Sequence, residues 1–185
     1  MNLANRITIA CIVSVPLFVT LLLYHSPEHP TFRLLALGVF LAACLSDALD
    51  GWLARRRNER TELGSYIDPI ADKLLLVSGF LSLSLIPDLP GAMHMPAWVT
   101  ISVLSRDLMI VIGAVVLFFT TGSLKPRPIF IGKITTVVQM ATLVAALSAM
   151  PYDLRLVLDG ATVFFTAWSG VLYVHMGGKM LQGAA

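Results

Sequence analysis

Residues 47 to 72 read DALDGWLARRRNERTELGSYIDPIAD and contain four aspartates and four arginines. This segment separates two apolar runs in a chain of 185 residues that is 57% hydrophobic and only 13% charged. About 25% of the residues of an ordinary soluble domain are charged. The composition therefore predicts an integral membrane protein, and its chemistry is expected in the polar segment.

Six apolar runs are predicted to be membrane-spanning helices, because a spanning helix takes roughly 20 residues. Together they predict one all-α domain over residues 1–185, without a sizeable soluble part. Connections that contain proline and glycine separate most of the runs. The predicted spans are Ile7–Tyr24, Phe32–Trp52, Gly64–Ile86, Ala97–Thr121, Phe130–Met150 and Arg155–Met176.

Basic residues gather on one side of the membrane when the six spans alternate in direction. The positive-inside rule assigns that side to the cytoplasm, or to the equivalent matrix side of an organelle. Both termini and the segment 47–72 are therefore predicted to face the cytoplasm. The basic residues on this side include Arg6, Arg55, Arg56, Arg57, Arg60, Lys125, Arg127 and Lys179, against Arg33 and Arg155 on the other.

The four aspartates form two pairs at helical spacing. Asp47 and Asp50 are three residues apart, and Asp68 and Asp72 are four apart, so each pair shares one face of its helix. A short connection makes the two helices antiparallel neighbours, and their carboxylates are expected to converge. Because four such charges repel one another, one divalent cation, or two, would stabilise them. Oxygen ligands favour Mg²⁺, with Mn²⁺ as a substitute.

Histidine and cysteine are not expected to contribute to this metal site. The four histidines do not show metal-ligand spacing with one another, so they are predicted to be surface residues. They are His25, His29, His94 and His175.

Small residues and an arginine accompany the carboxylates. Gly51, Ala54 and Gly64 remove side-chain bulk, which lets a large ligand approach the backbone. Arg55 has the planar donor geometry that suits phosphate oxygens. Carboxylates, metal, arginine and open space together indicate a phosphoryl or pyrophosphate site.

The spacing of these residues resembles the signature of the CDP-alcohol phosphotransferase family. This resemblance implies a membrane enzyme, usually a homodimer, that transfers a substituted phosphate from a CDP-linked donor to an alcohol and releases CMP. The small size and the six predicted spans are also similar to that family. The matching pattern is Asp47-x2-Asp50-Gly51-x2-Ala54-Arg55-x8-Gly64-x3-Asp68-x3-Asp72.

The resemblance also implies a role for each residue of the motif. It implies that Asp47, Asp50 and Asp68 hold two metal ions against the donor pyrophosphate. It implies that Asp72 is the general base and also lies close to a metal. The residues implied to contact the donor are Asp47, Gly51, Ala54, Arg55, Gly64 and Asp68.

Two subfamilies compete for the identity of the acceptor. An active site at the membrane edge favours CDP-diacylglycerol as donor, since this lipid arrives from the bilayer. The opening NLANRITIA is similar to phosphatidylglycerophosphate synthases, which use glycerol 3-phosphate. The segments SRDLMIVIGAVV (105–116) and LKPRPIFIGKITTVVQ (124–139) are more similar to eukaryotic-type cardiolipin synthases, which use phosphatidylglycerol. Phosphatidylglycerol is the predicted acceptor, with glycerol 3-phosphate as the alternative.

Arg106 and Lys133 are the predicted acceptor and phosphate-binding residues. An unpaired charge inside a span costs at least about 2.5 kcal/mol, so Arg106 is expected to pair with a phosphate or a carboxylate. The structural alternatives are an ion pair with the adjacent Asp107 for Arg106, and a flanking charge at a span end for Lys133. Tyr173 is interpreted as an interfacial anchor and packing residue.

Two functions of other classes remain as alternatives. A transporter would usually carry ionisable groups near the bilayer midplane, whereas these aspartates gather at one edge. A scaffold protein would not require the acidic spacing. Membrane lipids are the expected partners, and nucleic acid is not.

Overall fold

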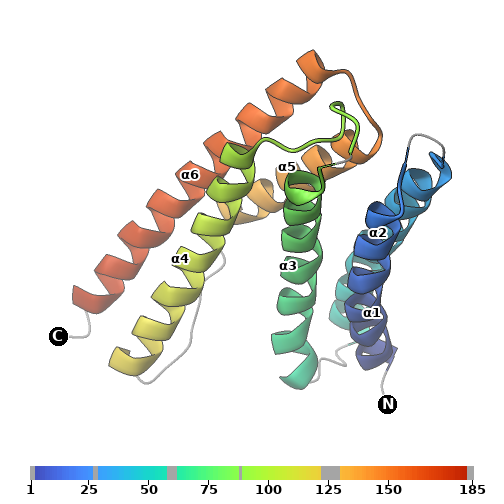
Figure 1. The fold of residues 1–185 in the computed structure, drawn as a ribbon. Helices are drawn as coiled ribbons and strands as arrows, with labels where there is room; N and C mark the ends of the chain where they lie inside the picture. The colour runs from blue at the N-terminus through green and yellow to red at the C-terminus, as the bar shows by residue number, and fades with distance from the viewer. Residues whose placement is uncertain (1–2, 27–28, 58–61, 88, 122–129, 183–185) are drawn as a thin grey trace. The chain divides into compact units, whose positions relative to one another are not determined.

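The computed structural model describes residues 3–26, 29–57, 62–87, 89–121 and 130–182, with side chains for residues 12–26, 29–46, 73–87, 89–117, 119–120 and 130–179. This part of the chain is helical, which confirms the predicted all-α class. It contains six helices, which Figure 1 draws as coiled ribbons. They are α1 (Leu3–Leu23), α2 (Thr31–Arg57), α3 (Glu62–Leu85), α4 (Ala97–Thr121), α5 (Phe130–Leu147) and α6 (Tyr152–Gln182).

Proline marks two of the helix starts. Pro96 and Pro151 stand directly before α4 and α6, where a missing N–H costs nothing. The Pro151 carbonyl accepts a hydrogen bond from the Arg155 N–H at 3.1 Å, so α6 begins three residues before its predicted start. Pro16 lies inside α1 without ending it.

Three of the helices are long and apolar enough to cross a membrane. The qualifying stretches are Ala97–Leu117 in α4, Phe130–Leu147 in α5 and Tyr152–Lys179 in α6. Within the described residues, the apolar stretches of the first three helices are shorter. They are Ile12–Leu23, Thr31–Ser46 and Lys73–Leu85.

The chain forms two compact units. The first contains residues 1–95 and 143–150, and in it α1 contacts both α2 and α3. Phe18 and Phe40 are fully buried between the first two helices, with ring centroids 5.8 Å apart. Gly79 of α3 gives room to Leu143, since a Cβ at Gly79 would lie 3.0 Å from Leu143 Cδ1.

His25, in the connection after α1, corrects one sequence expectation. Its side chain is buried rather than on the surface, and among the described residues neither ring nitrogen has a hydrogen-bond partner. His29, His94 and His175 are exposed, as expected. The turn that follows Leu22 and Leu23 folds His25 inward, which a loop position in the sequence does not indicate.

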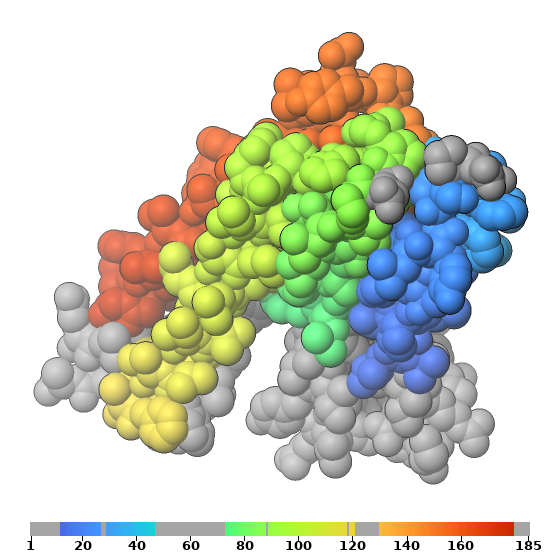
Figure 2. All heavy atoms as spheres, viewed as in Figure 1, coloured from blue at the N-terminus to red at the C-terminus, as the bar shows by residue number. Residues whose placement is uncertain are grey.

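The second unit contains residues 96–142 and 151–185. In it α4 and α6 lie against each other, and Figure 2 shows their side chains packed alongside one another. The start of α5 contacts α6 through buried polar side chains, which are described with the candidate site.

Helix α5 ends in a Schellman-type cap that has alanine at the position where glycine is usual. The N–H groups of Ala149 and Met150 donate to the carbonyls of Ala146 and Ala145, at 2.9 and 3.0 Å. Ala149 has a φ of 51°, in the left-handed region that glycine usually occupies at this position. This cap ends α5 three residues before the predicted boundary at Met150.

Replacing Ala149 with glycine is expected to stabilise the protein. An L-residue in this conformation costs roughly 1–2 kcal/mol, and the greater freedom of glycine in the unfolded chain offsets part of the gain. The melting temperature of the purified protein in detergent should therefore rise by a few degrees for Ala149→Gly. The matched change Ala141→Gly, inside α5, should lower it, because glycine weakens a helix interior. A lower melting temperature for Ala149→Gly would contradict the proposed strain.

Candidate functional site

The aspartate motif lies on two neighbouring helices of the first unit. The residues from Asp47 to Arg55 belong to α2, and those from Gly64 to Asp72 belong to α3. The two helices contact each other and run in opposite directions (Figure 1). The backbone therefore has the arrangement that the spacing predicts, with each aspartate pair at a register that shares one helical face.

The side chains of the motif lie outside the described residues. Their predicted roles in metal binding, donor binding and catalysis therefore stay predictions. The metal-ligand types in the motif still fit a hard divalent ion. Both helix segments supply carboxylates at helical register, and neither contains histidine or cysteine. The residues concerned are Asp47, Asp50, Gly51, Ala54, Arg55, Gly64, Asp68 and Asp72.

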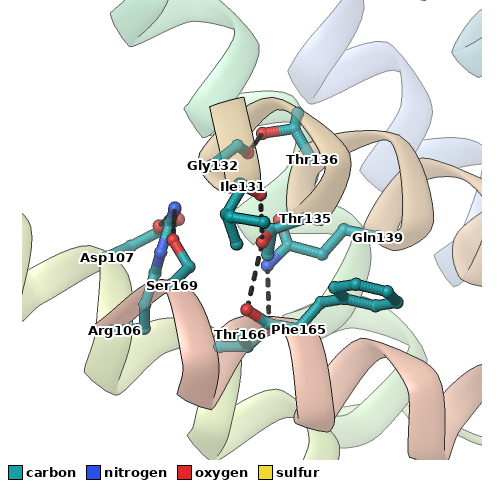
Figure 3. A network of polar contacts seen from close by, with 10 residues as sticks. All are labelled: Arg106, Asp107, Ile131, Gly132, Thr135, Thr136, Gln139, Phe165, Thr166 and Ser169. Carbon is teal, nitrogen blue, oxygen red and sulfur yellow. Dashed lines mark hydrogen bonds and ion pairs between the residues drawn. The ribbon is translucent and has the colours of Figure 1, made fainter. Parts of the chain in front are cut away.

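Arg106, in the second unit, is buried and held by three side chains. Its Nη1 donates to Asp107 Oδ1 at 2.8 Å, and its Nη2 donates to Ser169 Oγ at 2.7 Å. The Tyr173 ring lies against the guanidinium, 5.5 Å from centroid to Cζ. Figure 3 shows Arg106 and Asp107 from α4 meeting Ser169 from α6. The expected pairing of Arg106 with a carboxylate is confirmed, and Asp107 is that carboxylate.

Gly132 of α5 completes the surroundings of Arg106. A Cβ at Gly132 would lie 3.1 Å from Tyr173 Oη and 3.4 Å from Arg106 Nη2, so the glycine lets these two side chains approach the α5 backbone closely. Gly132 is the third residue of α5. Arg106 is therefore level with the first turn of this candidate span and not with its middle.

A ladder of buried polar contacts continues along α5 and α6 (Figure 3). Thr135 Oγ1 lies 3.1 Å from the Phe165 carbonyl oxygen, and Gln139 Nε2 donates to Thr166 Oγ1 at 3.3 Å. The hydroxyls of Thr142 and Thr162 are 2.7 Å apart, where either can donate. Interhelical hydrogen bonds of this kind stabilise helix pairs in membranes.

Lys133 lies on a different face of α5 from this ladder. It is exposed, as are Phe130 and Val137, whereas Thr135 and Gln139 are buried. Gly132, which precedes Lys133, is the α5 residue that lies beside Arg106. Lys133 follows it about 100° further around the helix, with an exposed side chain.

A second ion pair is buried near the start of α6. Arg155 Nε lies 3.6 Å from Asp159 Oδ2, and both side chains are almost fully buried. Arg155 also lies over the Tyr152 ring, at 5.8 Å. The sequence predicted Arg155 only as a charge that helps to set membrane topology. In the structure its side chain is buried against Asp159 and the Tyr152 ring.

Sequence reasoning missed the residues that hold Arg106. Tyr173 was interpreted as an interfacial anchor and packing residue, and its contact with the Arg106 guanidinium was not predicted. Ser169 and Gly132 were not singled out at all. The available signal was a set of small or hydroxyl residues at α5 and α6 positions within apolar runs, which in membrane helices marks close packing.

The Arg106–Asp107 pair is expected to contribute to stability only as a pair. Arg106→Met or Asp107→Leu alone should lower the free energy of unfolding by about 3–5 kcal/mol, because each removes one partner of a buried ion pair. The double variant should recover most of this loss. Thermal unfolding of the four proteins measures the coupling, with the exposed Leu108→Met as control. Additive losses would contradict the pairing.

Comparisons with known proteins place the chain in one family. A family model described as CDP-alcohol phosphatidyltransferase matches residues 1–171. A Mycobacterium tuberculosis protein named probable phosphatidylglycerophosphate synthase is 36% identical over 94% of this chain and 80% of its own length. Human cardiolipin synthase (CMP-forming) is 33% identical over 80% of this chain and 54% of its own length. A Bacillus subtilis CDP-diacylglycerol–glycerol-3-phosphate 3-phosphatidyltransferase is 32% identical over 98% of this chain and 97% of its own length. The chain belongs to the CDP-alcohol phosphatidyltransferase family and is a transferase of phospholipid synthesis.

Proposed function

We propose that the chain transfers a phosphatidyl group from CDP-diacylglycerol to the hydroxyl of phosphatidylglycerol, forming cardiolipin and CMP. Family membership over residues 1–171, together with the intact motif of eight specified positions, is the observation that carries this proposal. The acceptor hydroxyl oxygen forms a bond to the phosphorus next to the diacylglycerol. The bond from that phosphorus to the CMP oxygen breaks, and the hydroxyl proton passes to Asp72.

The motif residues divide this work in the proposed site. Asp47, Asp50, Asp68 and Asp72 would hold one or two Mg²⁺ or Mn²⁺ ions, which when bound neutralise the pyrophosphate and stabilise the leaving CMP. Gly51, Ala54 and Gly64 leave space for the donor nucleotide, and Arg55 contacts its phosphates. Asp72, as general base, would accept the proton of the acceptor hydroxyl.

The choice of phosphatidylglycerol rests on the cations available to the acceptor. Glycerol 3-phosphate carries close to two charges, whereas phosphatidylglycerol carries one. Asp107 already compensates Arg106, and Lys133 lies on another face of its helix. Cations that are few and partly compensated suit a singly charged phosphodiester better than a doubly charged phosphate monoester. The names of the mycobacterial and Bacillus relatives favour glycerol 3-phosphate, which is the second candidate acceptor.

The proposed enzyme is an integral membrane protein with one catalytic domain over residues 1–185. Six helices and a family model that covers 1–171 support this organisation. The basic residues flanking the motif support a site that faces the cytoplasm, or the matrix side, with both termini there. A homodimer is proposed from the family resemblance. A transporter or scaffold function would instead leave CDP-diacylglycerol unconsumed.

Activity is expected to depend on a hard divalent ion. Four carboxylates on the paired helices would repel one another without a cation, so chelation with EDTA should abolish CMP release from CDP-diacylglycerol. Added Mg²⁺ or Mn²⁺ should restore it. A melting curve recorded with and without EDTA serves as the folding control. Full turnover in excess chelator would contradict the metal assignment.

Asp72→Asn is expected to remove catalysis while leaving donor binding largely intact. Loss of a general base typically costs about 10²- to 10⁴-fold in rate. Asp47→Asn or Asp68→Asn should instead weaken both metal and CDP-diacylglycerol binding. Measuring CMP release beside equilibrium binding of the donor separates the two effects. Normal turnover by Asp72→Asn would require another base.

Product analysis tests the acceptor. Purified enzyme with CDP-diacylglycerol and Mg²⁺ is given either phosphatidylglycerol or glycerol 3-phosphate, and the lipid products are separated by chromatography. Cardiolipin is expected from the first mixture, and Arg106→Ala or Lys133→Ala should reduce its formation. If only glycerol 3-phosphate yields a lipid product, the cardiolipin assignment is wrong, while donor, motif and metal remain supported.

A further inference from the structure

A groove of about 640 Å³ lies between α4 and α6 of the second unit. This volume is in the range of small-molecule sites, roughly 300–1,000 Å³. Most of its lining is apolar, and both helices that form it contain candidate membrane spans. Arg106 is part of the wall. All of the residues that line the groove belong to the second unit, whereas the aspartate motif belongs to the first.

Three hydroxyl groups on the groove wall bond within the protein. Ser102 and Ser105 donate to carbonyls of their own helix, at 2.7 and 2.6 Å. Thr166 accepts the hydrogen bond from Gln139. The other polar side chains on the wall are Arg106 and the exposed His175, and the rest of the wall is apolar.

Arg106 retains donors for a ligand. A guanidinium has five N–H donors, and contacts with Asp107 and Ser169 use two of them. The side chain keeps 7% of its surface exposed and forms part of the groove wall. A phosphodiester beside Arg106 would place one negative charge against the cation.

The groove runs past Arg106 along α4 and α6. Arg106 donates to Ser169, and Ala167, two residues before Ser169 on α6, also lines the groove. The wall extends from Ile101 to Met109 on α4. A chain attached to a phosphate at Arg106 would lie in this groove and run past Ala167.

We propose that the α4–α6 groove holds an acyl chain of the acceptor phospholipid, whose phosphodiester meets Arg106. The proposal rests on phosphatidylglycerol being the acceptor, as proposed above. Glycerol 3-phosphate has no acyl chain and would leave the groove without a role. The groove would thus select a lipid acceptor by the length of its chain as well as by its charge.

Filling the groove tests this assignment. Ala167→Leu adds bulk in the groove, and Ala141→Leu makes the same change on the exposed face of α5. Phosphatidylglycerol with a photoreactive diazirine in mid-chain is cross-linked to each protein without donor, and the labelled peptides are mapped by mass spectrometry. Labelling of residues 101–109 and 166–175 is expected in the wild type and in Ala141→Leu, with at least a fivefold loss in Ala167→Leu.

Kinetics with two acceptors complete the test. Ala167→Leu should raise the KM for dioleoyl phosphatidylglycerol at least fivefold, and should change the KM values for dihexanoyl phosphatidylglycerol and CDP-diacylglycerol less than twofold. Cardiolipin formation with unchanged KM values, or labelling that Ala167→Leu does not reduce, would overturn the groove assignment alone. If the wild type forms no cardiolipin, the proposed acceptor fails, and the chain assigned to the groove fails with it.

Discussion

The burial of a guanidinium among apolar helices is the constraint on which the second unit depends. A charge in this environment is costly unless it is paired and hydrogen-bonded. Asp107 supplies the countercharge from the same helix, but a carboxylate alone leaves most donors unsatisfied. Ser169 and Tyr173 from α6, and the missing side chain of Gly132 on α5, complete the surroundings. Helices α4, α5 and α6 thus meet at the Arg106 side chain, and its contacts set how closely the three helices approach one another.

Much of the fold was predictable because its signals are local. Apolar runs about 20 residues long, most of them separated by proline and glycine, predicted each of the six helices, and the bounds of α4 agree at both ends. Helix α2 ends five residues after its predicted end at Trp52, and α6 ends six residues after Met176. Two other differences have local causes. Pro151 starts α6 earlier than its apolar run, and the left-handed Ala149 ends α5 before its run does. The burial of His25 depends on tertiary packing, and the loop sequence carries no signal of it.

The candidate site also contains local features that were predictable and long-range contacts that were not. Aspartates at helical spacing carry their register in the sequence, so the two motif helices and their contact were predictable. The ion-pair partner of Arg106 on its own helix was also predictable, because Asp107 is adjacent in the sequence. Ser169 is 63 residues away, and nothing in a local pattern connects it to Arg106. The phosphate-binding role of Lys133 stays a prediction, and its side chain is exposed on α5.

The ladder between α5 and α6 has a consequence for biogenesis. Each helix carries threonine, and α5 also carries glutamine, at positions that would face hydrocarbon if the helix entered the bilayer alone. Their mutual hydrogen bonds run from Thr142 near the tight turn to Thr135, so the two segments can satisfy one another as soon as both have left the insertion machinery. Only four residues separate the two helices. Partitioning as a hairpin therefore avoids an intermediate in which one helix exposes its amide and hydroxyls to lipid.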